Sequence, residues 1–175
     1  MELVAAQLQE AVCRGDTERM HVEVTHFMNS TVTAEQLFDL LKLQTNNGTT
    51  FLHQAAYKGQ TELMTIVNST MNDEQWYNLL KISTHKGGTP LHYAVYSGQT
   101  ATAEQWNDLL EISANYGETP LHRAACFGHI EMIEHFCNTV TAKQWYHLLN
   151  MGTCVLRCTG VMFLVFSIAF SFFMK

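Results

Sequence analysis

The sequence predicts an all-α protein: a helical repeat solenoid followed by a single hydrophobic helix that we expect to span a membrane. Three observations in the 175 residues lead to this prediction. The phrase Thr-Pro-Leu-His occurs at residues 89–92 and 119–122, and a related Thr-Phe-Leu-His occurs at 50–53. A second phrase, which ends in Leu-Leu, occurs four times. An uninterrupted stretch of uncharged, mostly apolar residues extends from 158 to 174.

Each copy of the first phrase marks the beginning of a helix. A hydroxyl residue suits the N-cap, and proline suits the first turn because its missing N–H would be unpaired there in any case. All three copies continue as His-x-Ala and reach a glycine six residues after the histidine, at Gly59, Gly98 and Gly128. Three copies of one helix start therefore predict three copies of one structural unit.

This pattern resembles the ankyrin repeat. The resemblance implies that His53, His92 and His122 hydrogen-bond to backbone and join neighbouring units, and that they do not serve as ligands. Residues 1–32 hold a degenerate unit that lacks the phrase, as is common for the terminal unit of a solenoid. We expect a degenerate N-terminal capping repeat at 1–44, ankyrin-like repeats at 45–149, and a link with a hydrophobic tail at 150–175.

The second phrase predicts a further short helix in each unit, because each copy begins with Thr or Asn as an N-cap. Its glutamines lie 39, 30 and 39 residues apart, whereas an ankyrin repeat has about 33 residues, so the unit is long and one copy is shortened. Residues 61–67 and 130–136 also have helical apolar spacing, and which helix corresponds to the ordinary second ankyrin helix stays open. We expect three tryptophans to pack in the core: Trp76, Trp106 and Trp145.

Composition and charge favour a protein partner over a nucleic acid. The chain is 47% hydrophobic and 15% charged, with a formal net charge of −6. Residues 1–134 carry seven Lys or Arg against sixteen Asp or Glu, whereas residues 135–175 carry three basic residues and no acidic one. Because no basic cluster is present to displace counterions from phosphates, we exclude nucleic acid as a partner.

No motif indicates an enzyme, and we predict no cofactor, no metal and no small-molecule substrate. The sequence has no phosphate-binding loop and neither the His-Glu-x-x-His nor the Gly-x-Ser-x-Gly pattern. The five cysteines are odd in number and lack paired ligand spacing, so neither a disulfide framework nor a zinc site is indicated, and a reducing compartment is the simpler interpretation. His122 and Cys126 are an alternative, a catalytic pair four residues apart, but the other copies have Tyr57 and Tyr96 in place of the cysteine.

By resemblance to ankyrin arrays, a protein partner is expected to bind the exposed side of the first helices and the tips of the turns. Residues there vary between copies, whereas Leu52, Leu91 and Leu121 stay apolar. Tyrosine and arginine are frequent anchors of protein interfaces. The predicted partner-binding residues are Gln54, Tyr57, Lys58, Tyr93, Tyr96, Arg123 and Phe127 on the helices, with His85, Lys86, Asn115 and Tyr116 at the tips.

The repeat pattern stops at residue 150, and an apolar stretch follows. As a helix, residues 155–174 would span about 30 Å, the thickness of a bilayer core. Lys143 and Arg157 on one side against Lys175 on the other place the repeats on the cytoplasmic side of a single-pass protein; a cytoplasmic location is the alternative. The stretch is apolar all round, which favours a span over an amphipathic helix that caps the stack, but a packed cap and a truncated end stay open.

These observations predict a non-enzymatic protein–protein interaction module, an ankyrin-repeat adaptor, held at a membrane through residues 155–174. One alternative is a soluble ankyrin-repeat binding protein whose tail is a packed cap. Another is a fragment of a larger ankyrin-containing membrane protein, such as a channel or a transporter. The family resemblance does not identify the partner.

Overall fold

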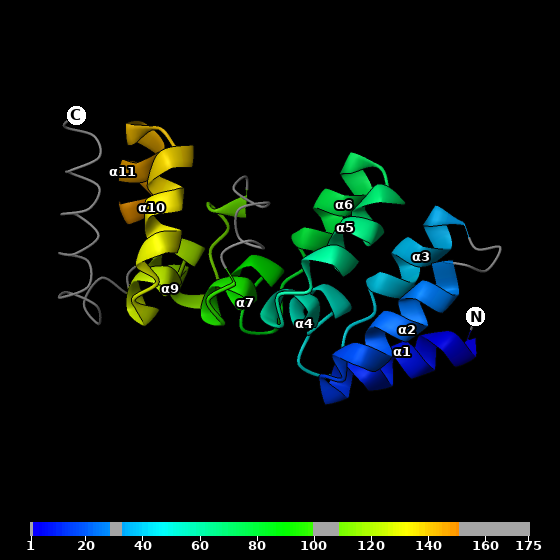
Figure 1. Ribbon diagram of the computed structural model, residues 1–175. Coiled ribbons are helices and arrows are strands. Elements are labelled where there is room, and N and C mark those ends of the chain that lie inside the picture. The colour runs from blue at the N-terminus through cyan, green and yellow to red at the C-terminus, as the bar shows by residue number, and fades with distance from the viewer. Residues whose placement is uncertain (1, 29–32, 100–108, 151–175) are drawn as a thin grey trace.

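The computed structural model describes residues 2–28, 33–99 and 109–150, and every regular element within these ranges is helical (Figure 1). The prediction of an all-α fold is therefore confirmed for this part of the chain. The elements are α1 (Glu2–Arg14), α2 (Thr17–Met28), α3 (Ala34–Leu41), α4 (Phe51–Tyr57), α5 (Thr61–Ser69), α6 (Asp73–Leu80), α7 (Pro90–Tyr96), the 3-10 helix η2 (Asn115–Gly117), α9 (Pro120–Phe127), α10 (Ile130–Thr139) and α11 (Ala142–Asn150).

The long repeats are three-helix units. In the sets α4–α5–α6 and α9–α10–α11, the first helix begins at the Thr-x-Leu-His phrase, a glycine turn leads to the second helix, and the Leu-Leu phrase forms the third. Helices α1, α2 and α3 follow one another in the same way. The question left open by the sequence is thus answered: the segments 61–67 and 130–136 are second helices, and the Leu-Leu phrase is the additional one. Most of the third copy of that phrase, 102–110, lies outside the described residues.

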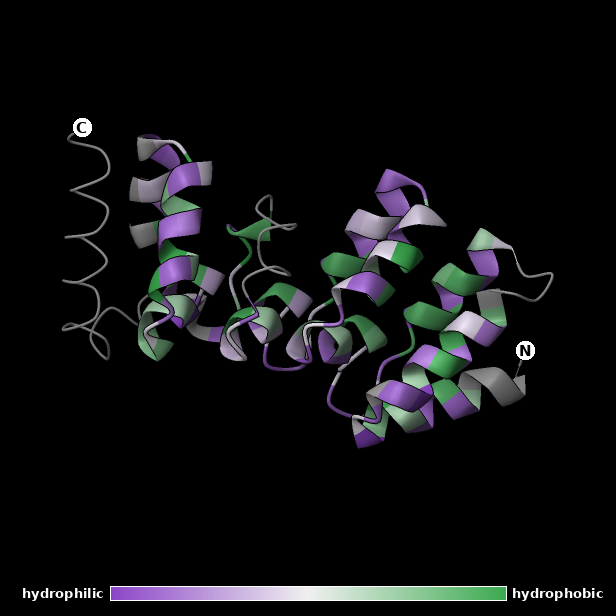
Figure 2. Ribbon diagram, in the orientation of Figure 1, coloured by the Kyte–Doolittle hydropathy of each residue, from purple (hydrophilic) through white to green (hydrophobic). Residues whose placement is uncertain are grey.

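The units stack so that equivalent helices lie side by side. The first helices form a row in which α1 packs on α4, α4 on α7, and α7 on α9, while the third helices α3 and α6 also touch. Figure 1 shows α4, α7 and α9 along one side of an elongated array, with the second and third helices rising from it. Leu52 and Leu91 are 0% exposed and Leu121 is 1% exposed, so the leucine of each phrase is buried between units. Hydrophobic and hydrophilic residues share most helices in Figure 2, as expected for helices that bury one face.

The first helices begin as the sequence predicts. Thr50, Thr89 and Thr119 occupy the N-cap with extended backbone, and proline stands in the first turn of α7 and α9. The third residue of each helix is the histidine, whose ring accepts the backbone N–H of the capping threonine, as a Glu or Gln side chain does in an ordinary capping box. The phrase is therefore a self-contained helix-start signal.

The turns between units pair with one another through their backbones. His85 donates its N–H to the carbonyl of Asn47 at 3.1 Å, and Asn115 donates its N–H to the carbonyl of Lys86 at 3.1 Å. The Asn115 side chain adds a bond from Nδ2 to the carbonyl of His85 at 3.2 Å. Successive turns thus form a ladder along one edge of the array, which fixes how far each unit is offset from the next.

The third helices carry side-chain caps and pack their tryptophans inward. Gln75 and Asn72 form a reciprocal capping box on α6, and the same arrangement is present on α3. Trp145 is 4% exposed, and Trp76 is partly buried against the core. Both tryptophans therefore have the packing role expected of them; Trp106 lies outside the described residues.

Within 2–28, 33–99 and 109–150, no helix combines the length and the apolarity needed to cross a bilayer. The predicted span, residues 155–174, lies outside these ranges.

Candidate docking site

The phrase histidines have structural roles. The Nδ1 atoms of His53 and His92 accept the N–H of Thr50 and Thr89, so these rings are neutral with the proton on Nε2. Nε2 of His53 donates to the carbonyl of Gly88 at 3.0 Å, and Nε2 of His92 donates to that of Glu118 at 3.0 Å. Burial lowers the pKa of each ring from 6.5 to about 4. His53 and His92 therefore each tie one unit to the next, as the resemblance implied, whereas the described residues show no such tie for His122.

His122 and Cys126 do not form a catalytic pair. His122 holds Thr119 in the same way, with Oγ1 to Nδ1 at 2.7 Å, and its buried Nε2 has no hydrogen-bond partner within the described ranges. Burial also lowers the pKa of His122. Cys126 is disulfide-bonded, so it offers no thiolate, and the expectation of reduced cysteines is wrong for this residue. Cys13 and Cys137 are free thiols, and burial raises the pKa of Cys137 to about 11.

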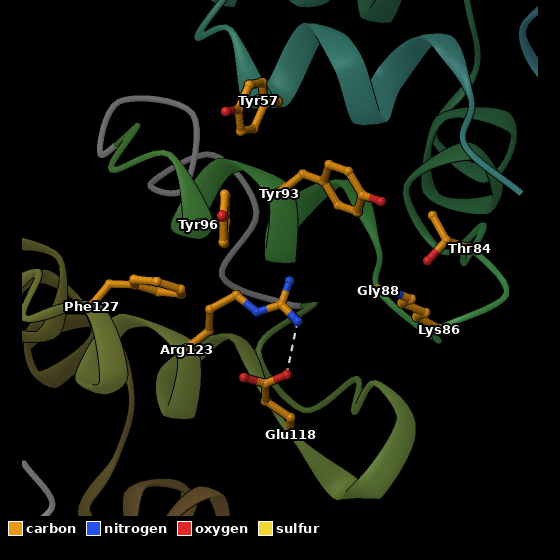
Figure 3. Close-up of a pocket in the computed structure, with 9 residues that line it drawn as sticks. All are labelled: Tyr57, Thr84, Lys86, Gly88, Tyr93, Tyr96, Glu118, Arg123 and Phe127. Carbon is orange, nitrogen blue, oxygen red and sulfur yellow. Dashed lines mark hydrogen bonds and ion pairs between the residues drawn. The ribbon is translucent and has the colours of Figure 1, made fainter. Parts of the chain in front are cut away.

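More than half of the predicted partner-binding residues line one pocket. It has a volume of about 340 Å³ and lies where α4, α7 and α9 meet the turns (Figure 3). Six of the eleven predicted residues line it: Tyr57, Lys86, Tyr93, Tyr96, Arg123 and Phe127. The sequence identified these residues one by one, and the structure brings them together.

An aromatic row forms one side of the pocket. Tyr57, Tyr96 and Phe127 come from the C-terminal ends of α4, α7 and α9, one from each of three successive units. The rings of Tyr57 and Tyr96 stack with centroids 6.0 Å apart, and Phe127 meets Tyr96 edge-on at 4.9 Å. Tyr96 is 51% exposed and Phe127 is 49% exposed, so the row is fixed by its neighbours yet open to solvent. Aromatic pairs of this kind contribute about 0.5–1.5 kcal/mol each beyond the area that they bury.

The other side of the pocket is polar. Arg123 reaches back from α9, and its Nη2 lies 2.8 Å from a carboxylate oxygen of Glu118. Nη1 of Arg123 also donates to the carbonyl of His92 at 3.4 Å. Tyr93 lies between the two sides, with its ring held edge-on against that of His53 at 5.0 Å. Lys86 is exposed at the turn and completes the polar side.

The remaining predicted residues lie outside the lining. Gln54 is half-buried, and Lys58 is exposed with its Nζ 5.7 Å from the ring centre of Tyr57. His85 and Asn115 are exposed and belong to the ladder of turns. Of Tyr116, the structure describes the backbone alone, within η2.

Sequence reasoning missed three lining residues: Thr84, Gly88 and Glu118. All three belong to the turns that precede the Thr-Pro-Leu-His phrases. Their position in the sequence could have identified two of them, because Gly88 and Glu118 stand immediately before the capping threonines of α7 and α9. The carbonyls of these two residues accept the hydrogen bonds of the histidines in the preceding units. The resemblance pointed to the tips of these turns, whereas the pocket also uses their inner ends.

No group of three or more His, Cys, Asp or Glu side chains able to hold a metal ion occurs in the part of the chain that the structure describes. What the site offers is an open aromatic surface beside charged groups. Such an arrangement suits non-covalent recognition.

Comparison with known families gives a match to a repeat family. The family model for ankyrin repeats, built as three copies, matches residues 11–105 and 78–145, which together cover most of the 175 residues. No curated protein matches the sequence. On the family match, and in agreement with the Thr-Pro-Leu-His phrases and the histidine ties described above, the chain belongs to the ankyrin repeat family.

Proposed function

We propose that this protein is an ankyrin-repeat adaptor that binds a partner protein through the first helices and turns of its array. The observation that carries the proposal is the aromatic row of Tyr57, Tyr96 and Phe127, which crosses three units and stays open to solvent. The family supports the same conclusion, because ankyrin repeats generally serve as protein-interaction modules.

The physical support is preorganisation. A side chain that is already held in its bound position loses little conformational entropy when a partner docks. Tyr96 is packed between Tyr57 and Phe127, and Arg123 is held by Glu118 and by a backbone carbonyl. Aromatic and arginine anchors in fixed positions are the usual centres of binding energy in protein interfaces.

Comparative capture tests this function. The full chain, in a mild detergent, is used to capture crosslinked partners from cells, alongside Tyr96→Ala and Tyr77→Ala. Tyr77 is a matched control because it is 42% exposed on α6, away from the pocket lining. We expect Tyr96→Ala to lose a specific partner that the wild type and Tyr77→Ala retain. Identical partners with all three proteins would contradict a docking face on the first helices.

A membrane tether is a second part of the proposal, and its support is the sequence of residues 155–174. Apart from Arg157 this segment carries no charge, and its length suits a bilayer core. With the tether in place, the repeats would face the cytoplasm, because Lys143 and Arg157 flank the apolar stretch on the repeat side and Lys175 alone follows it.

Carbonate extraction of membranes tests the tether. We expect the full chain to stay in the membrane pellet and a variant lacking residues 155–174 to be released, because only an inserted helix resists high pH. Protease added to sealed vesicles reports the side on which the repeats lie. Release of the full chain by carbonate would favour the alternative, in which the tail packs as a cap on a soluble array.

A further inference from the structure

We propose that the pocket between α4, α7 and α9 binds an extended peptide segment of the partner that carries one large apolar side chain and one carboxylate. This inference rests on the proposed function, because it assigns the chemistry of the partner to the same docking face. It goes further by stating which side chains the partner must present and where each one lies.

The size of the pocket limits what it can take. A volume of about 340 Å³ is at the lower end of the range of about 300–1,000 Å³ typical of small-ligand sites. Such a space holds one or two side chains of a peptide rather than an element of a folded domain. The pocket is partly open to solvent, so the rest of the peptide can lie outside it (Figure 3).

The aromatic row is the surface on which the apolar side chain of the peptide would pack. Tyr96 and Phe127 are each about half exposed, and an apolar side chain laid against them would remove both rings from water. Burying apolar surface contributes a favourable free energy of about 25 cal/mol per Å². Because Tyr57 and Phe127 hold Tyr96 in place from both sides, the surface is formed before the peptide arrives.

The charged residues of the pocket lining determine which polar group the peptide must carry. The pocket contains Lys86, Arg123 and Glu118, and Glu118 is already paired with Arg123 at 2.8 Å. Lys86 makes no ion pair with any residue that the structure describes, so the lining carries one uncompensated positive charge. An uncompensated positive charge is unusual in this part of the chain, because residues 1–134 carry sixteen acidic side chains and only seven basic ones. A carboxylate is the group that complements this charge.

Aromatic rings also attract cations, so a lysine or arginine of the partner is the competing occupant. Lys86, the uncompensated charge of the lining, would repel it. The one carboxylate in the lining, Glu118, is already neutralised by Arg123. The charge balance therefore favours an acidic peptide over a basic one.

The arrangement of the two halves fits an extended chain. Figure 3 shows Tyr57, Tyr96 and Phe127 on one side, with Lys86, Gly88 and Thr84 on the other and Tyr93 and Arg123 between them. In an extended peptide, side chains two residues apart point the same way and lie about 6.5–7 Å from each other. We therefore expect both side chains on one face of a short extended segment.

Selection from a displayed library of random seven-residue peptides tests the inference directly. The full chain is the target, and a Tyr96→Ala/Lys86→Gln double variant serves for counter-selection. Enrichment of peptides that combine Leu, Ile, Phe or Trp with Asp or Glu is the expected result. Enrichment of Lys or Arg instead, or no enrichment over the double variant, would overturn the proposal.

A titration with one selected peptide then separates the two halves. Measured by fluorescence anisotropy, Tyr96→Ala should weaken binding at least about tenfold, as for a central anchor. Replacing the peptide's Asp by Asn should weaken binding about two- to fivefold on the wild type, the range of an exposed ion pair, and should have no effect on Lys86→Gln. Tyr77→Ala, the matched control, should bind as the wild type does, and equal unfolding midpoints show that each variant is folded. If Asn and Asp peptides bind the wild type equally, Lys86 does not read a carboxylate.

The two proposals fail in different ways. If the cellular partner is still lost with Tyr96→Ala but the selected peptides carry no acidic residue, the docking face stands and its chemistry is wrong. If neither a partner nor a peptide depends on Tyr96, the docking face itself is wrong.

Discussion

At the scale of single residues, His53 and His92 each perform two tasks with their two ring nitrogens. Nδ1 caps the helix to which it belongs, and Nε2 binds the turn of the next unit, as His53 does with Gly88 at 3.0 Å. Both bonds require the neutral ring with its proton on Nε2, because a charged ring would have no acceptor for the threonine N–H. Local folding and stacking are thus linked through one side chain, and both depend on its charge.

This linkage predicts a pH-dependent stability. In the folded protein, the pKa of His53 and of His92 is lowered from 6.5 to about 4, mainly because burial disfavours the charged ring. Above pH 6.5 both rings are neutral in the folded and unfolded states, so they add no pH dependence. Between pH 6.5 and about 4 the unfolded chain takes up protons that the folded chain excludes, so stability falls as pH falls. The loss is on the order of 3 kcal/mol for each histidine, and it is complete below pH 4.

Urea unfolding at a series of pH values between 4 and 8 measures this effect. We expect the free energy of unfolding to be level above about pH 6.5 and to decline steadily below it. A His92→Gln variant, which cannot be protonated, should be less stable at pH 7.5 but should show a shallower decline. A wild-type curve that stays level down to pH 4.5 would show that the buried rings are not excluded from protonation.

At the scale of elements, how far the sequence predicts structure depends on how local the signal is. The first helices were predictable because threonine, proline and histidine fix the helix start within four residues. The third helices were predictable for the same reason, through caps such as Asn72 with Gln75. The assignment of the second helices was not, because two neighbouring apolar segments of similar length compete for that role, and tertiary packing decides between them.

The pocket shows the same limit. The types of its residues were apparent from the sequence. The positions of Tyr96 and Arg123 hold different residues in different copies, whereas the position of Leu91 and Leu121 holds leucine in each copy. Their convergence was not apparent, because it depends on the offset between units, and the offset is set by backbone bonds between turns, such as Asn115 N–H to the carbonyl of Lys86 at 3.1 Å. No side-chain pattern encodes that distance.

The turn itself yields a prediction about Gly87. Its φ is 76°, and a Cβ added there would lie 2.6 Å from the backbone nitrogen of Asn115. Gly128, at the end of α9, is a matched control because its φ is 71° but nothing lies within 4 Å of an added Cβ. Gly128→Ala should therefore cost about 1 kcal/mol for the left-handed backbone alone, and Gly87→Ala at least about twice as much. Equilibrium unfolding measures both, and equal losses would show that the turns are free to separate.

At the scale of the whole molecule, the array is held together by neighbours. Among the described helices, every pair that packs closely belongs either to one unit or to two successive units, as with α1 on α4 and α7 on α9. In such a chain of units, stability is approximately a sum of terms for each unit and for each interface between neighbours. A docking site that spans α4, α7 and α9 therefore uses three units and both of the interfaces between them.

This organisation predicts that damage stays local. Leu121 is 1% exposed on α9, and Leu121→Ala leaves a cavity that costs about 2–5 kcal/mol. Because the interfaces of α9 are with α7, α10 and α11, hydrogen exchange measured by mass spectrometry should accelerate in those helices, while α1 and α2 keep their protection. Leu52→Ala on α4 is the converse test, and it should accelerate exchange in α1, α2, α5 and α7 more than in α10. An equal acceleration in every helix with either variant would mean that the array unfolds as a single cooperative body, and binding at the pocket would then stabilise all units alike rather than the three that line it.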